Sequence, residues 1–160
     1  MALLHIYDAD DARIVGTAEA RTVEGAKLML PISNNGSNLI SGLDSLVGGR
    51  TYDRILFETH GSPGRLYFGS AHIDAAWVTA NMLNRRYDTI TPHSTRIYFN
   101  GCNVAEGSAG SQFMRAIASV FLTRGGGEVF GHTSVGLEVP IYSWLTGHVV
   151  HVTGERKIIY

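Results

Sequence analysis

The sequence has very little cysteine, because Cys102 is the only one among 160 residues. A single thiol excludes an intramolecular disulfide and any zinc site built from several thiolates. The sequence also lacks a large excess of either sign of charge, since it has 13 basic and 14 acidic residues and a formal net charge of −1 at pH 7. Without a basic surplus, we expect neither nucleic acid nor an anionic membrane as a partner.

Long hydrophobic runs are also missing. The apolar stretch at 26–32 contains Pro31 and falls far short of the roughly 18 residues that cross a bilayer. The N-terminus has no basic start and no long apolar core, so it does not resemble a secretory signal. We therefore expect a cytoplasmic protein without a transmembrane helix.

What the sequence does contain is the composition of an ordinary globular domain. Apolar residues make up 44% of the chain and charged residues 17%, and a chain of this size can bury about two-thirds of its surface. The glycines are spread along the sequence, which shows no linker, repeat or low-complexity tract. We expect a single domain over residues 1–160.

Segments with strand and helix periodicity alternate along the chain. Strands are predicted at 3–7, 54–61, 95–102 and 128–131, and helices at 39–47, 73–87 and 113–124. The segment 13–32 is ambiguous, with strand-like Ile14-Val15 and Leu28–Leu30, and the tail at 148–160 is predicted to form an edge hairpin. Alternating strands and helices favour an α/β domain with a mostly parallel sheet flanked by helices.

Two of the predicted strands end on residues that can do chemistry. His60 and Gly61 close one strand, and Gly101 and Cys102 close the next. Because ligands of open parallel sheets bind beyond the carboxyl ends of the strands, we expect the imidazole and the thiol at the same edge. An ordinary thiol has a pKa near 8.5 and is only about 3% thiolate at pH 7, so a nucleophilic cysteine needs a neighbouring base. His60 could be that base.

The sequence around these residues resembles a known family. Residues 60–64, HGSPG, and residues 100–107, NGCNVAEG, are similar to motifs of the caspase-like cysteine peptidases of clan CD. They are most similar to a bacterial domain that carries HGSPG and GCNVAxG. The resemblance covers about residues 54–135, and it implies a caspase/haemoglobinase-like fold of three layers.

The resemblance also implies the roles of a thiol protease. Cys102 is expected to be the nucleophile, and His60 the general base and acid. The backbone amides of Gly61 and Cys102 are expected to form the oxyanion hole, and the reaction would pass through a thioester. We therefore expect a hydrolase, namely a cysteine endopeptidase that acts on protein or peptide substrates. A second copy of the chain, forming a homodimer, is the other partner considered.

Three residues are candidates for substrate binding: Asn100, Gly101 and Trp144. Asn100 stands two positions before the cysteine, where caspases line their substrate pocket, although an asparagine there can equally cap a turn. Relatives that cut after Lys or Arg commonly carry an acidic residue at this position. Caspases that cut after Asp have an arginine shortly after a Ser-Trp pair, whereas Leu145 follows Ser143-Trp144 here. The sequence therefore favours neither cleavage after a basic residue nor cleavage after aspartate.

Other interpretations stay open. The chain could be an inactive caspase-like binding module, or a thiol-dependent transpeptidase or deamidase. Glu58 shares a strand face with His60 and could orient the imidazole, although an exposed or salt-bridged carboxylate is more common.

The remaining histidines do not indicate a metal site. His148 and His151 face opposite sides of a predicted strand. His72, His93 and His132 have no acidic or cysteine companions at ligand spacing, and a surface or helix-start position is expected for them. We expect no metal and no cofactor.

Overall fold

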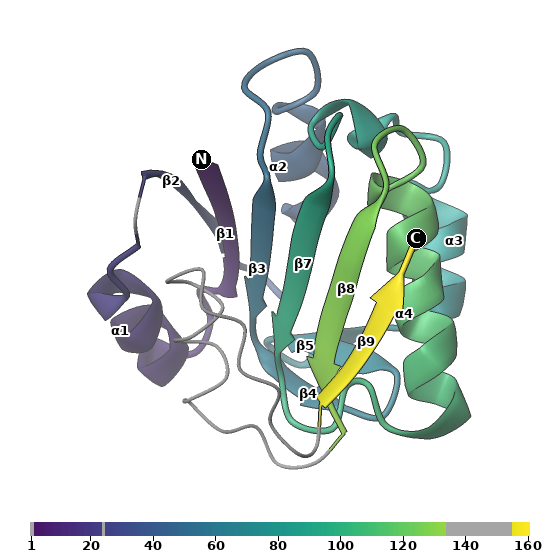
Figure 1. Cartoon of the computed structure of the whole chain (residues 1–160). Helices are drawn as coiled ribbons and strands as arrows, with labels where there is room; N and C mark the ends of the chain where they lie inside the picture. Colours follow the sequence, from purple (N-terminus) through teal and green to yellow (C-terminus); the bar gives the residue numbers. More distant parts are fainter. Residues whose placement is uncertain (1, 24, 134–154) are drawn as a thin grey trace.

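The computed structural model describes residues 2–23, 25–133 and 155–160. Six strands form one sheet in the order β2-β1-β3-β7-β8-β9 (Figure 1). They are β1 (Ala2–Asp8), β2 (Ala26–Ile32), β3 (Arg54–Glu58), β7 (Thr95–Asn100), β8 (Gly127–His132) and β9 (Glu155–Ile159). All neighbours run parallel except β8 and β9. The predicted α/β class with a mostly parallel sheet is confirmed.

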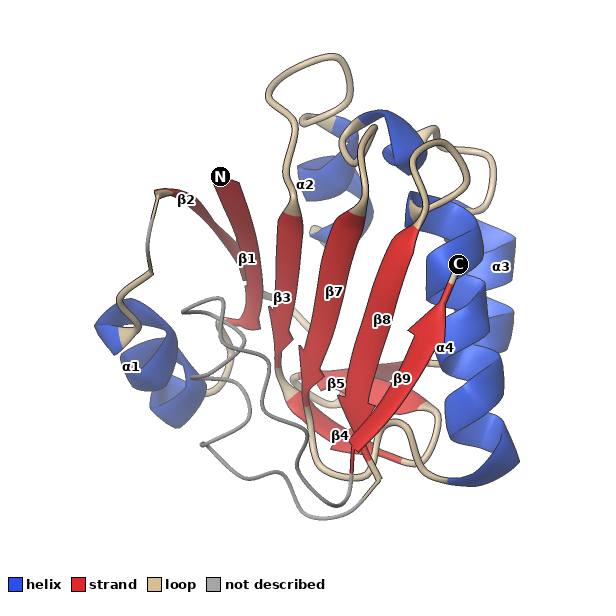
Figure 2. Cartoon of the chain, viewed as in Figure 1, coloured by secondary structure: helices blue, strands red, loops and turns tan. Residues whose placement is uncertain are grey.

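Helices cover both faces of this sheet (Figure 2). α2 (Leu39–Asp44), α3 (Ala75–Met82) and α4 (Gly107–Phe121) lie on one face, and α1 (Ala12–Ala20) lies on the other. Successive side chains of a strand point to opposite faces of the sheet, so each strand contributes apolar side chains to both faces. Ile55 and Phe57 of β3 belong to the core on the α4 side, whereas Leu56 packs on the opposite side. The helices therefore flank the sheet, as predicted.

The larger core lies between the sheet and α4. The apolar stripe predicted for this helix is buried: Phe113, Ile117, Val120 and Phe121. The ring of Phe113 lies 5.2 Å from that of Phe99 in β7, and Phe99 lies 5.1 Å from Phe57 in β3. Burying each such side chain contributes roughly 1.5–3 kcal/mol. The row of rings therefore fixes α4 against two strands whose ends carry the site.

A small antiparallel sheet follows β3, and the sequence did not reveal it. It consists of β4 (His60–Ser62), β5 (Arg65–Phe68) and β6 (Ala71–Ile73). The strand predicted over 54–61 is therefore split at Thr59, and His60 begins the small sheet rather than ending β3. Gly64 and Gly69 make the two tight turns with φ of 71° and 59°, a region that disfavours residues with a side chain.

The ambiguous segment begins as a helix. Ile14-Val15 lie in α1, so the strand-like interpretation of this pair is wrong. The Oδ1 atom of Asp11 accepts hydrogen bonds from the backbone N–H groups of Arg13 at 2.8 Å and Ile14 at 3.2 Å. This cap outweighs the modest strand preference of two β-branched residues. Leu28–Leu30 lie in β2, as predicted.

The helix predicted over 73–87 is shorter in the structure. α3 ends at Met82, and Arg86, with a left-handed φ of 62°, precedes a 3-10 turn, η1 (Tyr87–Thr89). The predicted stripe of Ile73, Trp77, Ala80, Leu83 and Tyr87 is therefore wrong as one helix face, and Leu83 is 46% exposed. α3 instead buries Val78 and Met82, because it packs against α4.

The C-terminal strand β9 lies at the edge of the sheet, where the tail was predicted to be. Its predicted hairpin partner, within 148–152, lies outside the described residues. Trp144 and the Ser-Trp pair lie outside them too. Among the described residues, no helix has the length and apolar character needed to cross a membrane.

Candidate active site

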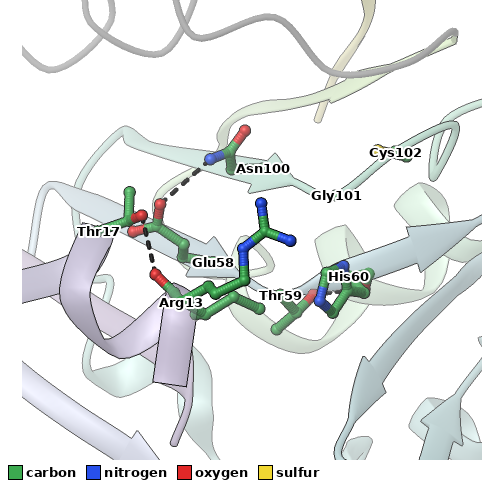
Figure 3. A pocket seen from close by; sticks show the side chains of 9 residues that line it. Arg13, Thr17, Glu58, Thr59, His60, Asn100, Gly101 and Cys102 are labelled. Carbon is green, nitrogen blue, oxygen red and sulfur yellow. Dashed lines mark hydrogen bonds between the residues drawn. The ribbon is translucent and has the colours of Figure 1, made fainter. Parts of the chain in front are cut away.

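A pocket of about 270 Å³ opens beyond the carboxyl ends of β3 and β7, beside α1 (Figure 3). Its lining residues are Arg13, Ile14, Thr17, Glu58, Thr59, His60, Asn100, Gly101 and Cys102. The chain runs from β1 outward to β2 and then returns to β3 on the other side of β1. Ligands of open α/β sheets bind beyond the carboxyl ends of the strands. The pocket lies at that edge, next to the switch in strand order between β1 and β3.

The structure brings His60 and Cys102 to this one pocket. β3 and β7 are in parallel register with Glu58 opposite Asn100, so the two chains leave the sheet at the same level. Cys102 is exposed, and the side chain of His60 is 65% exposed. Both groups are accessible to a molecule that enters the pocket. Gly101 and Asn100, predicted to bind substrate, line the pocket as well.

The glycines next to the histidine and the cysteine are in contact. A Cβ atom on Gly101 would lie 3.3 Å from the Cα of Gly61. A Cβ atom on Gly61 would lie 3.0 Å from the carbonyl oxygen of Cys102 and would overlap Cγ2 of Val104. The two main chains therefore approach to a distance that a side chain would prevent. The pairing of β3 with β7 and the absence of side chains at these two glycines together allow the two motifs to lie this close.

His60 has a partner that sequence reasoning missed. Its Nε2 lies 2.8 Å from Oδ2 of Asp11, 49 positions away in the chain. The hydrogen bond from His60, followed by those from the backbone of Ile14 and Arg13, lowers the pKa of Asp11. Asp11 is therefore ionised at neutral pH. The available sequence signal was an aspartate before a helix start, which predicts an N-cap but not a partner for the imidazole.

A buried charge network lies at the other end of the pocket, around Glu58. The Nε of Arg21 donates to both carboxylate oxygens at 2.8 and 2.9 Å, and the Nδ2 of Asn100 donates to Oε1 at 3.3 Å. His5 Nε2 lies 2.7 Å from Oε2. Burial alone would raise the pKa of Glu58, but the hydrogen bonds from His5 and Arg21 lower it to about 2. Glu58 is thus a salt-bridged carboxylate, whereas Asp11 is the one bonded to His60.

Comparison with known proteins places the chain in a family. Residues 18–124 match the family described as Domain of unknown function (DUF4347). The chain belongs to this family. The range that matches DUF4347 contains both the histidine and the cysteine motif, and no curated protein matches the chain.

Among solved structures, this DUF4347 chain is similar to a secreted C11 cysteine protease from Bacteroides thetaiotaomicron, determined in complex with an irreversible peptide inhibitor. The two are 10% identical, with a TM-score of 0.46. The match covers 84% of this chain and 49% of the other. The chain therefore spans about half the length of that protease.

Among the described histidines, His60 is the one that lines the pocket. Within the described part of this DUF4347 chain, no group of three or more His, Cys, Asp or Glu side chains could hold a metal ion. His132, expected at the surface, is only 3% exposed, because it ends β8 beside the ring of Tyr98. Burial lowers its pKa. His72 and His93 are exposed, as expected, whereas His148 and His151 lie outside the described residues.

Proposed function

We propose that the chain is a cysteine endopeptidase of the caspase-like type, in which His60 and Cys102 act as a dyad. One observation carries the proposal. The contact between Gly61 and Gly101 keeps an exposed thiol and an exposed imidazole at one pocket. A thiol and an imidazole that line one pocket at the carboxyl edge of a sheet supply the nucleophile and the base that covalent catalysis requires. The resemblance of both motifs to caspase-like peptidases supports the same reaction.

The proposed reaction has two stages. Sγ of Cys102 attacks the peptide carbonyl carbon while its proton passes to His60, and the backbone N–H groups of Gly61 and Cys102 stabilise the negative oxygen. The C–N bond then breaks, and the amine leaves with the proton from His60. Water, losing a proton to His60, hydrolyses the remaining thioester, which releases a carboxylic acid and restores the thiol.

The charges of the pocket favour an acidic side chain in the substrate. Glu58 faces the pocket, but Arg21, His5 and Asn100 already occupy its oxygens. The guanidinium of Arg13 projects into the pocket (Figure 3) and has no ion-pair partner among the described residues. A carboxylate in the pocket would pair with Arg13, whereas a basic side chain would find no free acceptor on Glu58.

A peptide library without sequence bias tests this function. Wild type is compared with Cys102→Ala, His60→Ala and His72→Ala, because His72 is an exposed histidine of the same small sheet and serves as the matched control. We expect cleavage by wild type and His72→Ala, enriched for acidic residues next to the cut. We expect a loss of about 100-fold or more in the other two variants.

The products decide between the alternatives. Hydrolysis yields two shorter peptides, transpeptidation yields joined peptides, and deamidation leaves the peptide length unchanged. The proposal is contradicted if no product depends on Cys102, both for the protein as purified and after limited proteolysis. That result would favour the binding module.

A further inference from the structure

We infer that Asp11 is the positioning residue of the proposed dyad, because its carboxylate determines which nitrogen of His60 carries the proton. The inference rests on the proposed function for its catalytic consequence. An ionised carboxylate only accepts hydrogen bonds, so at 2.8 Å from Oδ2 the Nε2 of His60 must be the donor. The neutral imidazole then keeps its lone pair on Nδ1. Nδ1 is the atom that can take the proton of Cys102.

The loop that carries Asp11 is itself held in place. Asp8 is only 2% exposed, and its oxygens accept hydrogen bonds from the backbone N–H groups of Asp10 and Gly69, each at 3.0 Å. The carboxylate of Asp10 accepts from the backbone of residues 34–35 at 3.0 and 2.8 Å. The second oxygen of Asp11 caps α1. These hydrogen bonds fix the position of Asp11, and its Oδ2 atom stays available to His60.

His60, in contrast, depends on this partner. Its side chain is 65% exposed, so packing restrains it little. Among the described residues, Asp11 is the one hydrogen-bond partner of its ring. Glu58, the acidic side chain that lines the pocket, is bonded to Arg21 and His5. Without Asp11 the imidazole would lose both its preferred tautomer and its fixed orientation.

The capping role of Asp11 can be separated from its role toward His60. Asn and Ser cap helices about as well as Asp does. In Asp11→Asn, the amide oxygen must serve the cap, so its N–H₂ group faces Nε2 and favours the opposite tautomer. In Asp11→Ser, the side chain caps but is too short to reach His60. Asp74→Ser is the matched control, because Asp74 caps α3 through the backbone of Trp77 at 2.9 Å.

The first readout is the tautomer of His60, measured by ¹⁵N NMR of the imidazole at pH 8.5. The measurement is made in a Cys102→Ala background, so that no thiolate acts on the ring. With Asp11 present, we expect the proton of the neutral imidazole on Nε2. When Asp11→Asn is added, we expect the tautomer population to shift toward the form with the proton on Nδ1. Asp74→Ser should leave the populations unchanged. Equal tautomer populations with and without Asp11→Asn would overturn the inference.

The second readout is the rate of Cys102-dependent cleavage or, with no substrate in hand, of Cys102 alkylation by iodoacetamide. We expect Asp11→Asn and Asp11→Ser to lower the rate by about 10- to 100-fold, and Asp74→Ser to change it less than twofold. Unchanged rates in both Asp11 variants would overturn the positioning role. A wild-type thiol that is unreactive would instead contradict the proposed function, and the tautomer measurement would still decide whether Asp11 sets the proton position.

Discussion

Gly61 and Gly101 lie between the histidine and the cysteine, and their backbones occupy space that side chains would fill. Gly61→Ala would place a methyl group against Val104 and 3.0 Å from the carbonyl oxygen of Cys102. We expect this variant to lower the free energy of unfolding by about 1–3 kcal/mol and to slow alkylation of Cys102. Urea denaturation and the alkylation rate measure the two effects.

A second glycine provides the control for this substitution. Gly16 lies in α1, and a Cβ atom there meets nothing within 4 Å. Gly16→Ala should therefore be neutral or stabilise the protein by up to about 1 kcal/mol, because alanine favours helices. If Gly61→Ala proved as stable as Gly16→Ala, the close contact between the two motifs would be contradicted.

The sequence revealed only some of the residues around the pocket. His60, Gly101 and Cys102 could be placed together because each follows a strand in a recognisable motif, and parallel strands end at a common edge. Asp11 and Arg13 could not be placed there, because they belong to the connection between β1 and β2 and no local sequence pattern links them to His60. The substrate-binding role of Trp144 stays a prediction.

At the scale of elements, Glu58 ties the end of β3 to Arg21, which follows α1. The two side chains are only 4% and 8% exposed. Glu58→Gln leaves the guanidinium buried without its anion, so we expect the free energy of unfolding at pH 7 to fall by about 3–5 kcal/mol. Chemical denaturation measures this.

An exposed ion pair between two neighbouring strands is the comparison for Glu58→Gln. Arg96 in β7 lies 3.5 Å from Glu128 in β8, and its side chain is 44% exposed. Arg96→Gln should cost less than about 1 kcal/mol, because water screens the pair. Equal losses in the two variants would contradict a special contribution of the buried network.

Helices and strands differed in how well their sequences revealed them. α4 was predictable because its apolar residues recur on one face that packs directly on the sheet. α3 was not, since its buried residues are set by contact with α4 rather than by a stripe facing the sheet. The apolar run at 54–61 gave no sign of the break at Thr59, because leaving the main sheet and starting the small sheet both require extended backbone.

At the scale of the whole molecule, several buried groups make stability depend on pH. Burial lowers the pKa of His5, although the hydrogen bond that His5 donates to Glu58 opposes this shift, and burial also lowers the pKa of His132. A pKa that is lower in the folded state means that the unfolded chain binds more protons, so acid destabilises the fold. For the two histidines this loss begins as the pH falls through 6.5.

Glu58 adds a second loss at lower pH. Its pKa falls from 4.5 to about 2 on folding, so its contribution is complete above pH 4.5 and is lost as the pH falls toward 2. We expect the free energy of unfolding to decrease from pH 8 to pH 5 and then more steeply below pH 4.5. Urea denaturation at a series of pH values measures this dependence, and a constant value from pH 8 to pH 4 would contradict it.

The layered arrangement followed from the alternation of strands and helices, but the strand order did not. Only the structure shows that β2 and β3 lie on opposite sides of β1, which places the pocket beside α1. Long-range pairing of this kind leaves no periodic signal in the sequence.

The most direct test of the account is the rate at which iodoacetamide alkylates Cys102 at pH 7, measured by intact mass in wild type and in His60→Ala. The account predicts that wild type reacts at least about tenfold faster, because the imidazole takes the proton from the sulfur. Equal rates in the two proteins would contradict the dyad.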